Sequence, residues 1–331
     1  MIRRASLWAL VPAVFSLAAL APFDAPSFGV SEGASVEKSF RTEGEFALED
    51  ASLLFNGEEA PLEQIGMPED LSLSFGVELG CSDTYESLGD ERPLVLLRSF
   101  DSARRWYEDQ DGDGEDEEPD VVGKVVRFAW NAEEELYEKS FVEEEGDEAD
   151  LDDLREDLDL RGILPDGDVS EGDSWTTDGI TLLELMMPGF DVRASIEGAD
   201  DEEIPLAVRE RVMALLEELA MDCVYAGTVE EDGLTLGKID LTAAVEEVVE
   251  VDPSWLMDEE DQAENPEFSW DHLDLDLDMS FEGSLLWDME AGRFHSFEGS
   301  TEGAATLDFA FAIEGFGLEI EGTMEFSANV E

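Results

Sequence analysis

One acidic segment, residues 109–120, has the clearest spacing of groups that could do chemistry. Aspartates occupy its first, third and fifth positions, and Gly114 stands sixth, where a sharp turn favours a residue without a Cβ. Ca²⁺ requires several oxygen ligands, and carboxylates at this spacing supply them from a single loop. The sequence therefore predicts a calcium loop with the ligands Asp109, Asp111, Asp113, Glu115 and Asp120.

The same segment departs from the calcium loop of EF-hand proteins. Asp116 occupies a position that is usually apolar, Asp120 replaces the long bidentate glutamate, and a strand rather than a helix is expected to follow. In so acidic a chain this spacing also arises readily by chance. A solvated hairpin insert at 109–120 is therefore the alternative interpretation.

Groups for nucleophilic or acid–base catalysis lack the context that they need. Gly29, Ser31 and Gly33 match the letters of a nucleophile elbow, yet no buried strand precedes them and no helix follows. His272 and His295 are the only histidines, and no ligand spacing connects them to a metal site. Carboxylates are too abundant for one pair to be singled out as general acid and base. We assign no catalytic residue and no cofactor other than Ca²⁺, and we expect a protein that is not an enzyme.

The composition restricts the partners. The chain carries 87 Asp and Glu against 18 Lys and Arg, a formal net charge of −69. We expect no nucleic-acid partner, because phosphate binding needs clustered Lys and Arg. With 43% hydrophobic residues and 19 Phe, the chain can still bury a core. The acidity favours a saline or cation-rich medium, and a cation-binding surface or a basic partner is the alternative explanation.

The N-terminus has the pattern of an export signal. Arg3 and Arg4 precede an apolar run from Ala5 to Leu20, and small residues follow it, so residues 1–21 are predicted to be a signal peptide without a well-defined cleavage site. Pro12 interrupts a run that is short for a membrane span, although an uncleaved anchor is the alternative. The expected location is the periplasm or the extracellular space.

Export would place the two cysteines in an oxidising compartment, where disulfides form. Cys81 lies on the apolar parity of a predicted strand, and Cys223 begins another. In an oxidising compartment they could form a disulfide, Cys81–Cys223, that closes a long loop. Two buried free thiols explain the same pattern.

Strict alternation of apolar and polar residues dominates the chain. From His272 to Phe281 the leucines, Met279 and Phe281 share one parity and the aspartates the other, which predicts a half-buried antiparallel strand. The apolar parity of 307–313 reverses after Gly315, as in a hairpin whose strands face one core. Ser280–Ser284 recurs as Ser296–Ser300, which predicts neighbouring strands. Further strands are expected over 40–48, 71–81, 94–100, 121–130, 136–142, 223–229 and 234–251.

Helices are expected to be few. They are predicted at a stripe of Leu151, Leu154 and Leu158, over Ile180–Met187, and over Pro205–Ala220. The elements together indicate an α+β, β-rich fold, with long curved antiparallel sheets or an open barrel and a few packed helices. Residues 30–331 are predicted to form a single domain with an acidic insert at 109–120. Two similar halves, 30–148 and 149–331, are the alternative.

The most distinctive phrase runs from Leu164 to Trp175. It reads as a turn, a short extended stretch and a second Gly-Asp turn that presents Trp175 to the core. With its surroundings it resembles a group of exported bacterial proteins, planctomycete-like in composition, that share an LPxxxVxxGDxW phrase. The resemblance implies a secreted antiparallel β-rich fold, and it implies no catalytic residue.

These observations favour an exported, non-enzymatic binding or scaffolding protein of the cell envelope, with an acidic surface suited to salt or divalent cations. A calcium-stabilised structural or adhesion module is one alternative. A carrier of a lipid or other apolar ligand is another, because the phenylalanines could line a cavity as well as fill a core.

Overall fold

The structure is a computed structural model, and it describes residues 25–62, 71–110, 112–143, 146–152, 154–189, 214, 219–250, 269–313 and 316–331. The predicted signal peptide, residues 1–21, and all but a few residues of the predicted helix over 205–220 lie outside this part of the chain. None of the helices in the described part is long and apolar enough to cross a membrane.

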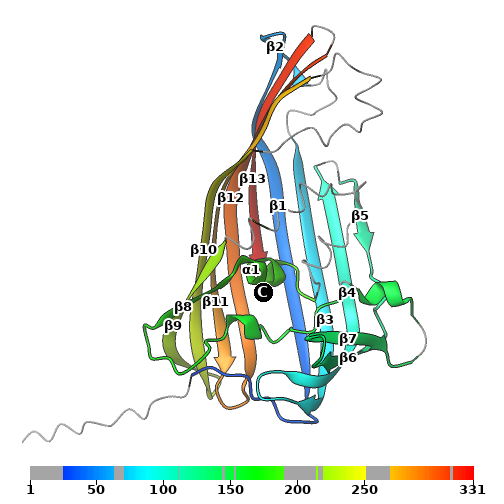
Figure 1. Cartoon of the computed structure of the whole chain (residues 1–331), viewed down its shortest axis with the longest axis vertical. Coiled ribbons are helices and arrows are strands. Elements are labelled where there is room, and N and C mark those ends of the chain that lie inside the picture. The colour runs from blue at the N-terminus through cyan, green and yellow to red at the C-terminus, as the bar shows by residue number, and fades with distance from the viewer. Residues whose placement is uncertain are drawn as a thin grey trace, which may run out of the picture.

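A single antiparallel sheet dominates the molecule (Figure 1). Its strands follow one another in the order β7-β6-β4-β3-β1-β13-β12-β11-β10-β9-β8, with β2 beside β1 and β5 beside β4. The sheet does not close into a barrel. The strand bounds are β1 Ser35–Phe55, β2 Glu58–Ala60, β3 Ser72–Leu88, β4 Pro93–Asp109, β5 Gly114–Glu117, β6 Val125–Asn131, β7 Leu136–Phe141, β8 Ser174–Asp178, β9 Ala220–Glu231, β10 Leu234–Glu250, β11 Ser269–Asp288, β12 Arg293–Ile313 and β13 Phe316–Val330.

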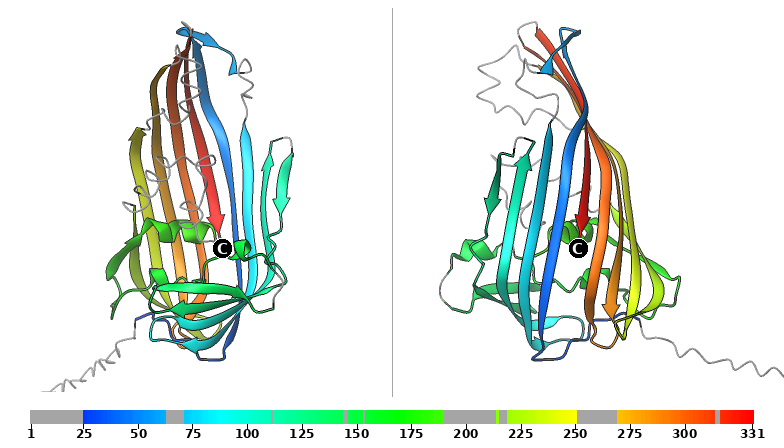
Figure 2. Two further views of the ribbon diagram at one scale, coloured as in Figure 1. Left: turned by 45° about the vertical axis from the view of Figure 1, so that its right-hand side comes forward. Right: turned by 180° about the vertical axis from the view of Figure 1, so that it is seen from behind.

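The sheet is curved, and helix α1 (Gly179–Met186) lies on its concave side (Figures 1 and 2). We call this side the inner face. Strand β1 pairs with β13 in the middle of the sheet, with Phe46 opposite Phe326. The strands of residues 30–148 therefore lie on one side of the β1–β13 junction and those of 149–331 on the other. The predicted β-rich α+β class is confirmed, in its form of a long curved antiparallel sheet.

The alternation read from the sequence sorts the side chains between the two faces. Leu277 and Met279 are half-buried on the inner face, and Phe281 is buried there. Asp276 and Asp278 are exposed on the outer face. The predicted amphipathic strand is therefore confirmed where its side chains are described.

The repeated phrase pairs with itself. Gly283 of β11 lies opposite Gly299 of β12, as the prediction of neighbouring strands requires. The buried ring of Phe281 lies over both glycines, and a Cβ added at either position would stand 2.9 Å from that ring. The glycines therefore make room for an aromatic side chain that lies flat on the sheet.

The core has two large clusters, which fill the inner face toward the β11–β12 turn, and a small third cluster of Leu53, Leu62 and Ile320. The first cluster gathers side chains from β1, β3, β4 and β6, including Tyr85 and Phe100. The second gathers side chains from β9, β10 and β11, including Trp287. Phe28 and Phe294 pack against both clusters and so connect them. Apolar burial on this scale provides the main stabilisation of the fold.

The predicted helices have mixed outcomes. Helix α1 agrees with the prediction over 180–187, and the Asp178 side chain caps it by accepting a hydrogen bond from the Thr181 N–H at 3.1 Å. In the described part of the leucine stripe at 151–158 the only helical element is a 3-10 turn, Glu148–Leu151. The Arg155 N–H donates to the Gly189 carbonyl at 3.0 Å and the Leu158 N–H to the Glu156 carbonyl at 3.0 Å, so these groups do not form the hydrogen bonds of an α-helix.

Candidate functional site

The predicted calcium segment folds as a β4–β5 hairpin. Asp109 Oδ1 accepts a hydrogen bond from the Asp113 N–H at 2.9 Å, and the Asp109 N–H donates to the Asp113 carbonyl at 2.9 Å. Arg104 forms an ion pair with Asp116 at 2.7 Å. Glu115 and Asp120 are exposed, and Asp111 lies outside the described residues. In the described part of the chain, no three His, Cys, Asp or Glu side chains gather to hold a metal ion.

The two cysteines are buried free thiols in this structure. Cys81 belongs to β3 and Cys223 to β9, and five strands separate these two in the sheet order. Burial raises the pKa of Cys81 to about 11 and that of Cys223 to about 12. Both thiols are therefore protonated and unreactive near neutral pH.

The other candidate groups from the sequence do not converge. His295 is exposed on β12, and the His272 side chain lies outside the described side chains. Ser31 lies in the loop before β1, where its carbonyl accepts a hydrogen bond from the Ala34 N–H and the neighbouring Gly33 N–H donates to the Tyr85 carbonyl. A nucleophile elbow would need a strand before the serine, and 27–32 is irregular.

A buried ion network, which the sequence analysis did not find, joins three strands to the segment that follows β7. Lys38 Nζ donates to Asp83 Oδ2 at 2.8 Å, to Asp159 Oδ1 at 2.7 Å and to the Tyr85 hydroxyl at 3.0 Å. The Tyr85 hydroxyl donates in turn to Asp159 at 2.7 Å. Arg98 donates two hydrogen bonds to the Asp83 carboxylate, at 2.7 Å and 2.9 Å. All five side chains are buried, and the two cations balance the two carboxylates.

The network changes the ionisation of its members. Burial alone would lower the pKa of Lys38, but the Asp159 and Asp83 carboxylates outweigh burial and raise this pKa well above its ordinary value. Burial would raise the pKa of Asp83, but Arg98 and Lys38 lower it to about 2. Both groups are therefore charged throughout the physiological range.

The segment after β7 extends the network outward to a hollow at the base of the sheet. Arg98 also donates to the backbone carbonyls of Arg155 and Glu156, at 2.6 Å and 2.7 Å. Arg161 pairs with Glu156 and, at 3.0 Å, with Asp157. Burial raises the pKa of Glu156 to about 7, and the Arg161 charge offsets this rise only in part.

We call this hollow the polar pocket. It has a volume of about 760 Å³, and its walls include Phe28, Arg92, Tyr137, Glu156, Arg161 and residues 164–168. Those last residues begin the distinctive phrase of the sequence. The Trp175 indole, half-buried against the second core cluster, donates to the Ile163 carbonyl at 2.9 Å and fixes the phrase against the core.

A second candidate surface lies on the inner face, beyond the core. Phe46, Phe75 and Phe326 come from the adjacent strands β1, β3 and β13, and we call them with Met324 the aromatic patch. The Phe46 ring centroid lies 5.2 Å from that of Phe75 and 5.9 Å from that of Phe326. Phe46 is 37% exposed and Met324 39% exposed. Large apolar side chains on this concave face are thus in contact with one another and still accessible.

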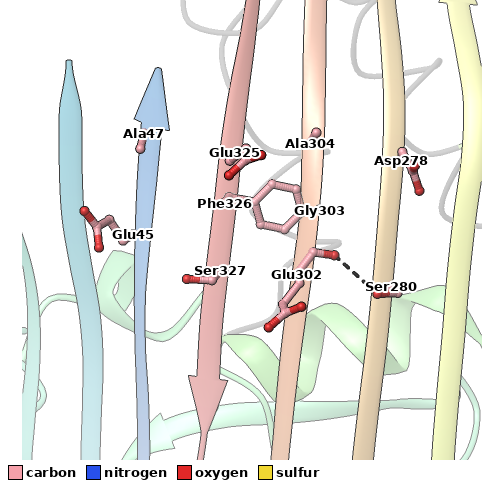
Figure 3. A pocket seen from close by; sticks show the side chains of 10 residues that line it. All are labelled: Glu45, Ala47, Asp278, Ser280, Glu302, Gly303, Ala304, Glu325, Phe326 and Ser327. Carbon is pink, nitrogen blue, oxygen red and sulfur yellow. Dashed lines mark hydrogen bonds between the residues drawn. The ribbon is translucent and has the colours of Figure 1, made fainter. Parts of the chain in front are cut away.

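The outer face opposite the aromatic patch has a shallow acidic groove of about 600 Å³ (Figure 3). Small residues from β1, β12, β11 and β13 form its floor, and Glu45, Glu325, Glu302 and Asp278 surround it (Figure 3). Phe326 of the aromatic patch also lines this groove, beside Gly303. The other side chains that line it are small or acidic, in contrast to the large apolar side chains of the inner face.

Parity was the signal that could have found the network. Lys38 stands between Val36 and Phe40 on the apolar parity of β1, and Arg98 stands between Leu96 and Phe100 on that of β4. A charged residue in such a position must be buried with a partner. The identity of the partner was not readable, because Asp159 lies 121 residues from Lys38 in the chain.

No protein-family model matches the chain, and no curated protein matches it.

Proposed function

We propose that this protein is an exported, non-enzymatic binding protein of the cell envelope that holds an apolar ligand on the inner face of its sheet. The aromatic patch is the observation that carries the proposal. Burying apolar surface that is exposed to water is favourable by about 25 cal/mol for each Å². An apolar molecule bound over these rings would bury their exposed surface and gain this free energy. Contiguous patches of this kind on folded proteins mark binding surfaces.

The shape of the inner face supports a ligand that is elongated. Between Met279 on β11 and Phe326 on β13, strand β12 presents the small residues Gly303 and Ala305, and the Phe326 ring lies over Gly303, where an added Cβ would stand 2.9 Å from it. Half-buried apolar residues continue from β11 to β3 across five neighbouring strands, a width of about 20 Å at the usual strand spacing. An extended acyl chain matches this width better than a compact molecule does.

The packing below the patch supports a preformed site. Phe40, six residues before Phe46 on β1, is buried in the first core cluster, and the chain rises about 20 Å between the two. A strand anchored in a packed core holds the residues beyond it in a fixed register. Little ordering cost then opposes binding.

The charge of the protein restricts the kind of apolar ligand. With a net charge of −69 and carboxylates on the outer face of the same strands, the protein repels anionic membrane surfaces and anionic head groups. The ligand is therefore a single amphiphile whose head group is neutral or cationic.

The test is a titration of the full mature chain with the uncharged fluorescent probe N-phenyl-1-naphthylamine. Phe326→Ser and Phe46→Ser should each weaken saturable binding about tenfold, which corresponds to about 1.4 kcal/mol, within the range for the loss of one aromatic contact. Val248→Ser is the matched control, because Val248 is 57% exposed but shares the parity of the exposed Glu246 on the outer face. Absence of saturable binding, or equal weakening by Val248→Ser, would refute the proposal.

Export is tested separately, by expressing the full chain and sequencing the N-terminus of the product. A mature protein that begins after the predicted signal, residues 1–21, supports export. A cytoplasmic product that retains Met1 contradicts it.

A further inference from the structure

The polar pocket is a second, separate site, at the base of the sheet, beside the core and apart from the aromatic patch. Residues from widely separated parts of the chain form its walls: Phe28 before β1, Arg92 in the β3–β4 turn, Tyr137 on β7, and the segment 156–168. The buried ion network fixes that segment, because Arg98 donates to the carbonyls of residues 155 and 156. The site is therefore built on rigid parts of the fold.

Glu156 leaves one hydrogen-bond acceptor unused at this pocket. Its side chain is 4% exposed, and Arg161 Nη2 donates to Oε2. Oε1 is buried and has no hydrogen-bond partner among the described residues, because the nearby Tyr137 hydroxyl donates to the Pro93 carbonyl at 2.6 Å. Arg161 is engaged by Glu156 and Asp157 together. A buried carboxylate oxygen that accepts no hydrogen bond destabilises the fold by its desolvation free energy. A ligand with an N–H or O–H donor could remove this penalty by binding to Oε1.

The charge and the rings around the pocket indicate what kind of donor fits. Two arginines line it, against six carboxylates: Asp90, Glu91, Glu156, Asp157, Asp166 and Asp168. The excess of negative charge favours a cation. The aromatic rings of Phe28 and Tyr137 also line it, and ring faces attract cations; the Arg161 guanidinium already lies 5.2 Å from the centre of the Phe28 ring.

We propose that the polar pocket binds a small ligand through a primary ammonium group, which donates a hydrogen bond to Glu156 Oε1 among the aromatic and acidic side chains of the pocket. The ammonium supplies the hydrogen-bond donor that the fold lacks. It also compensates the negative charge of Glu156, which Arg161 balances only in part because Arg161 pairs with Asp157 as well. A small amine, diamine or amine-bearing metabolite satisfies this requirement. An uncharged alcohol of the same size supplies a hydrogen bond but no charge.

The test compares 1,4-diaminobutane with 1,4-butanediol by calorimetric titration at about 0.5 M NaCl, where weak attraction to the acidic surface is screened. The structure predicts saturable binding of one diamine and none of the diol. Glu156→Gln should weaken diamine binding at least tenfold. Glu118→Gln is the matched control, because it removes the same charge from an exposed position outside the pocket. Equal weakening by both substitutions would show general attraction to an acidic surface and overturn the proposal.

A pH series on the wild-type protein keeps the test independent of whether Glu156→Gln folds. The groups that face Glu156 are Asp157, Asp159 and Arg161 on its own segment, Arg98 on β4 and Tyr137 on β7. Because burial raises the pKa of Glu156 to about 7, its ionised fraction falls about tenfold from pH 8 to pH 6. Diamine affinity should fall by the same factor. An affinity that does not change over this range would overturn the proposal.

Discussion

Replacement of Lys38 by methionine tests whether the buried ion network is a structural requirement of the fold. The substitution keeps an unbranched side chain of similar length and removes the ammonium. Asp83 retains its two hydrogen bonds from Arg98, but Asp159 keeps only the Tyr85 hydroxyl. The Asp159 side chain is 1% exposed, so Lys38→Met leaves an uncompensated buried carboxylate.

The expected cost follows from that burial. Removing one partner of a buried ion pair typically costs about 3–5 kcal/mol, most of which is the penalty for the charge that stays behind. Lys238→Met is the matched control: Lys238 Nζ lies 2.8 Å from Asp240, but the two side chains are 36% and 46% exposed. An exposed pair of this kind contributes about 0–1 kcal/mol.

The assay is urea unfolding at pH 7, followed by circular dichroism, with the wild type and both variants at one ionic strength. Lys38→Met combined with Asp159→Asn removes both charges and should recover a large part of the lost free energy of unfolding. If Lys38→Met and Lys238→Met cost the same, or if the double variant is no more stable than Lys38→Met, the reasoning about the network is wrong.

Four further predictions follow from individual contacts. The pKa of Glu156 is raised to about 7 in the fold, so the stability that this group contributes is present below its ordinary pKa and is lost as pH rises through 7. Glu156→Gln does not titrate, so from pH 4 to pH 8 its free energy of unfolding should rise relative to that of the wild type by on the order of 3 kcal/mol, as measured by urea unfolding at both pH values. The pKa of Asp83 is lowered to about 2, so its contribution is present above its ordinary pKa and lost as pH falls from about 4 to 2; acid titration followed by circular dichroism should show a flatter profile for Asp83→Asn. Gly299→Val should destabilise by about 1–3 kcal/mol in thermal or urea unfolding, because its Cβ would stand 2.9 Å from the Phe281 ring and 3.1 Å from the Phe297 ring, whereas Gly167→Ala, with nothing within 4 Å, should have little effect. The calcium prediction is tested by calorimetric titration with Ca²⁺: because the β4–β5 hairpin is closed by its own hydrogen bonds, we expect no heat that Asp113→Ala abolishes, and heat that this variant removes would support the calcium loop.

Side-chain parity made most of the sheet predictable. The alternation around Met279, the reversal of parity across Gly315 and the repeated Ser-Phe-Glu-Gly-Ser phrase each depend on contacts between neighbouring strands, and such contacts repeat every second residue. The parity rule needs no knowledge of distant parts of the chain. The pairing of β1 with β13 does need such knowledge, because nothing local to Phe46 identifies Phe326 as its neighbour.

The candidate sites were less predictable, because they depend on side chains that meet only in the folded chain. Lys38 could have been recognised as a buried charge from its position on the apolar parity, but its partner Asp159 could not. Glu156 is one of 87 acidic residues, and only the walls of the polar pocket distinguish it. The leucine stripe at 151–158 was misleading, because its spacing is helical but the Arg155 N–H donates to the distant Gly189 carbonyl instead of to a carbonyl of the same turn.

The most direct test of the proposed function is photolabelling of the mature protein with a long-chain alcohol that carries a diazirine in its acyl chain, followed by mass spectrometry of the peptides. We predict saturable labelling, competed by the unmodified alcohol, at the peptides of β1, β3 and β13 that contain Phe46, Phe75 and Phe326. Labelling that is not saturable, or that is equally strong at the peptide containing Val248 on the outer face, would contradict the account.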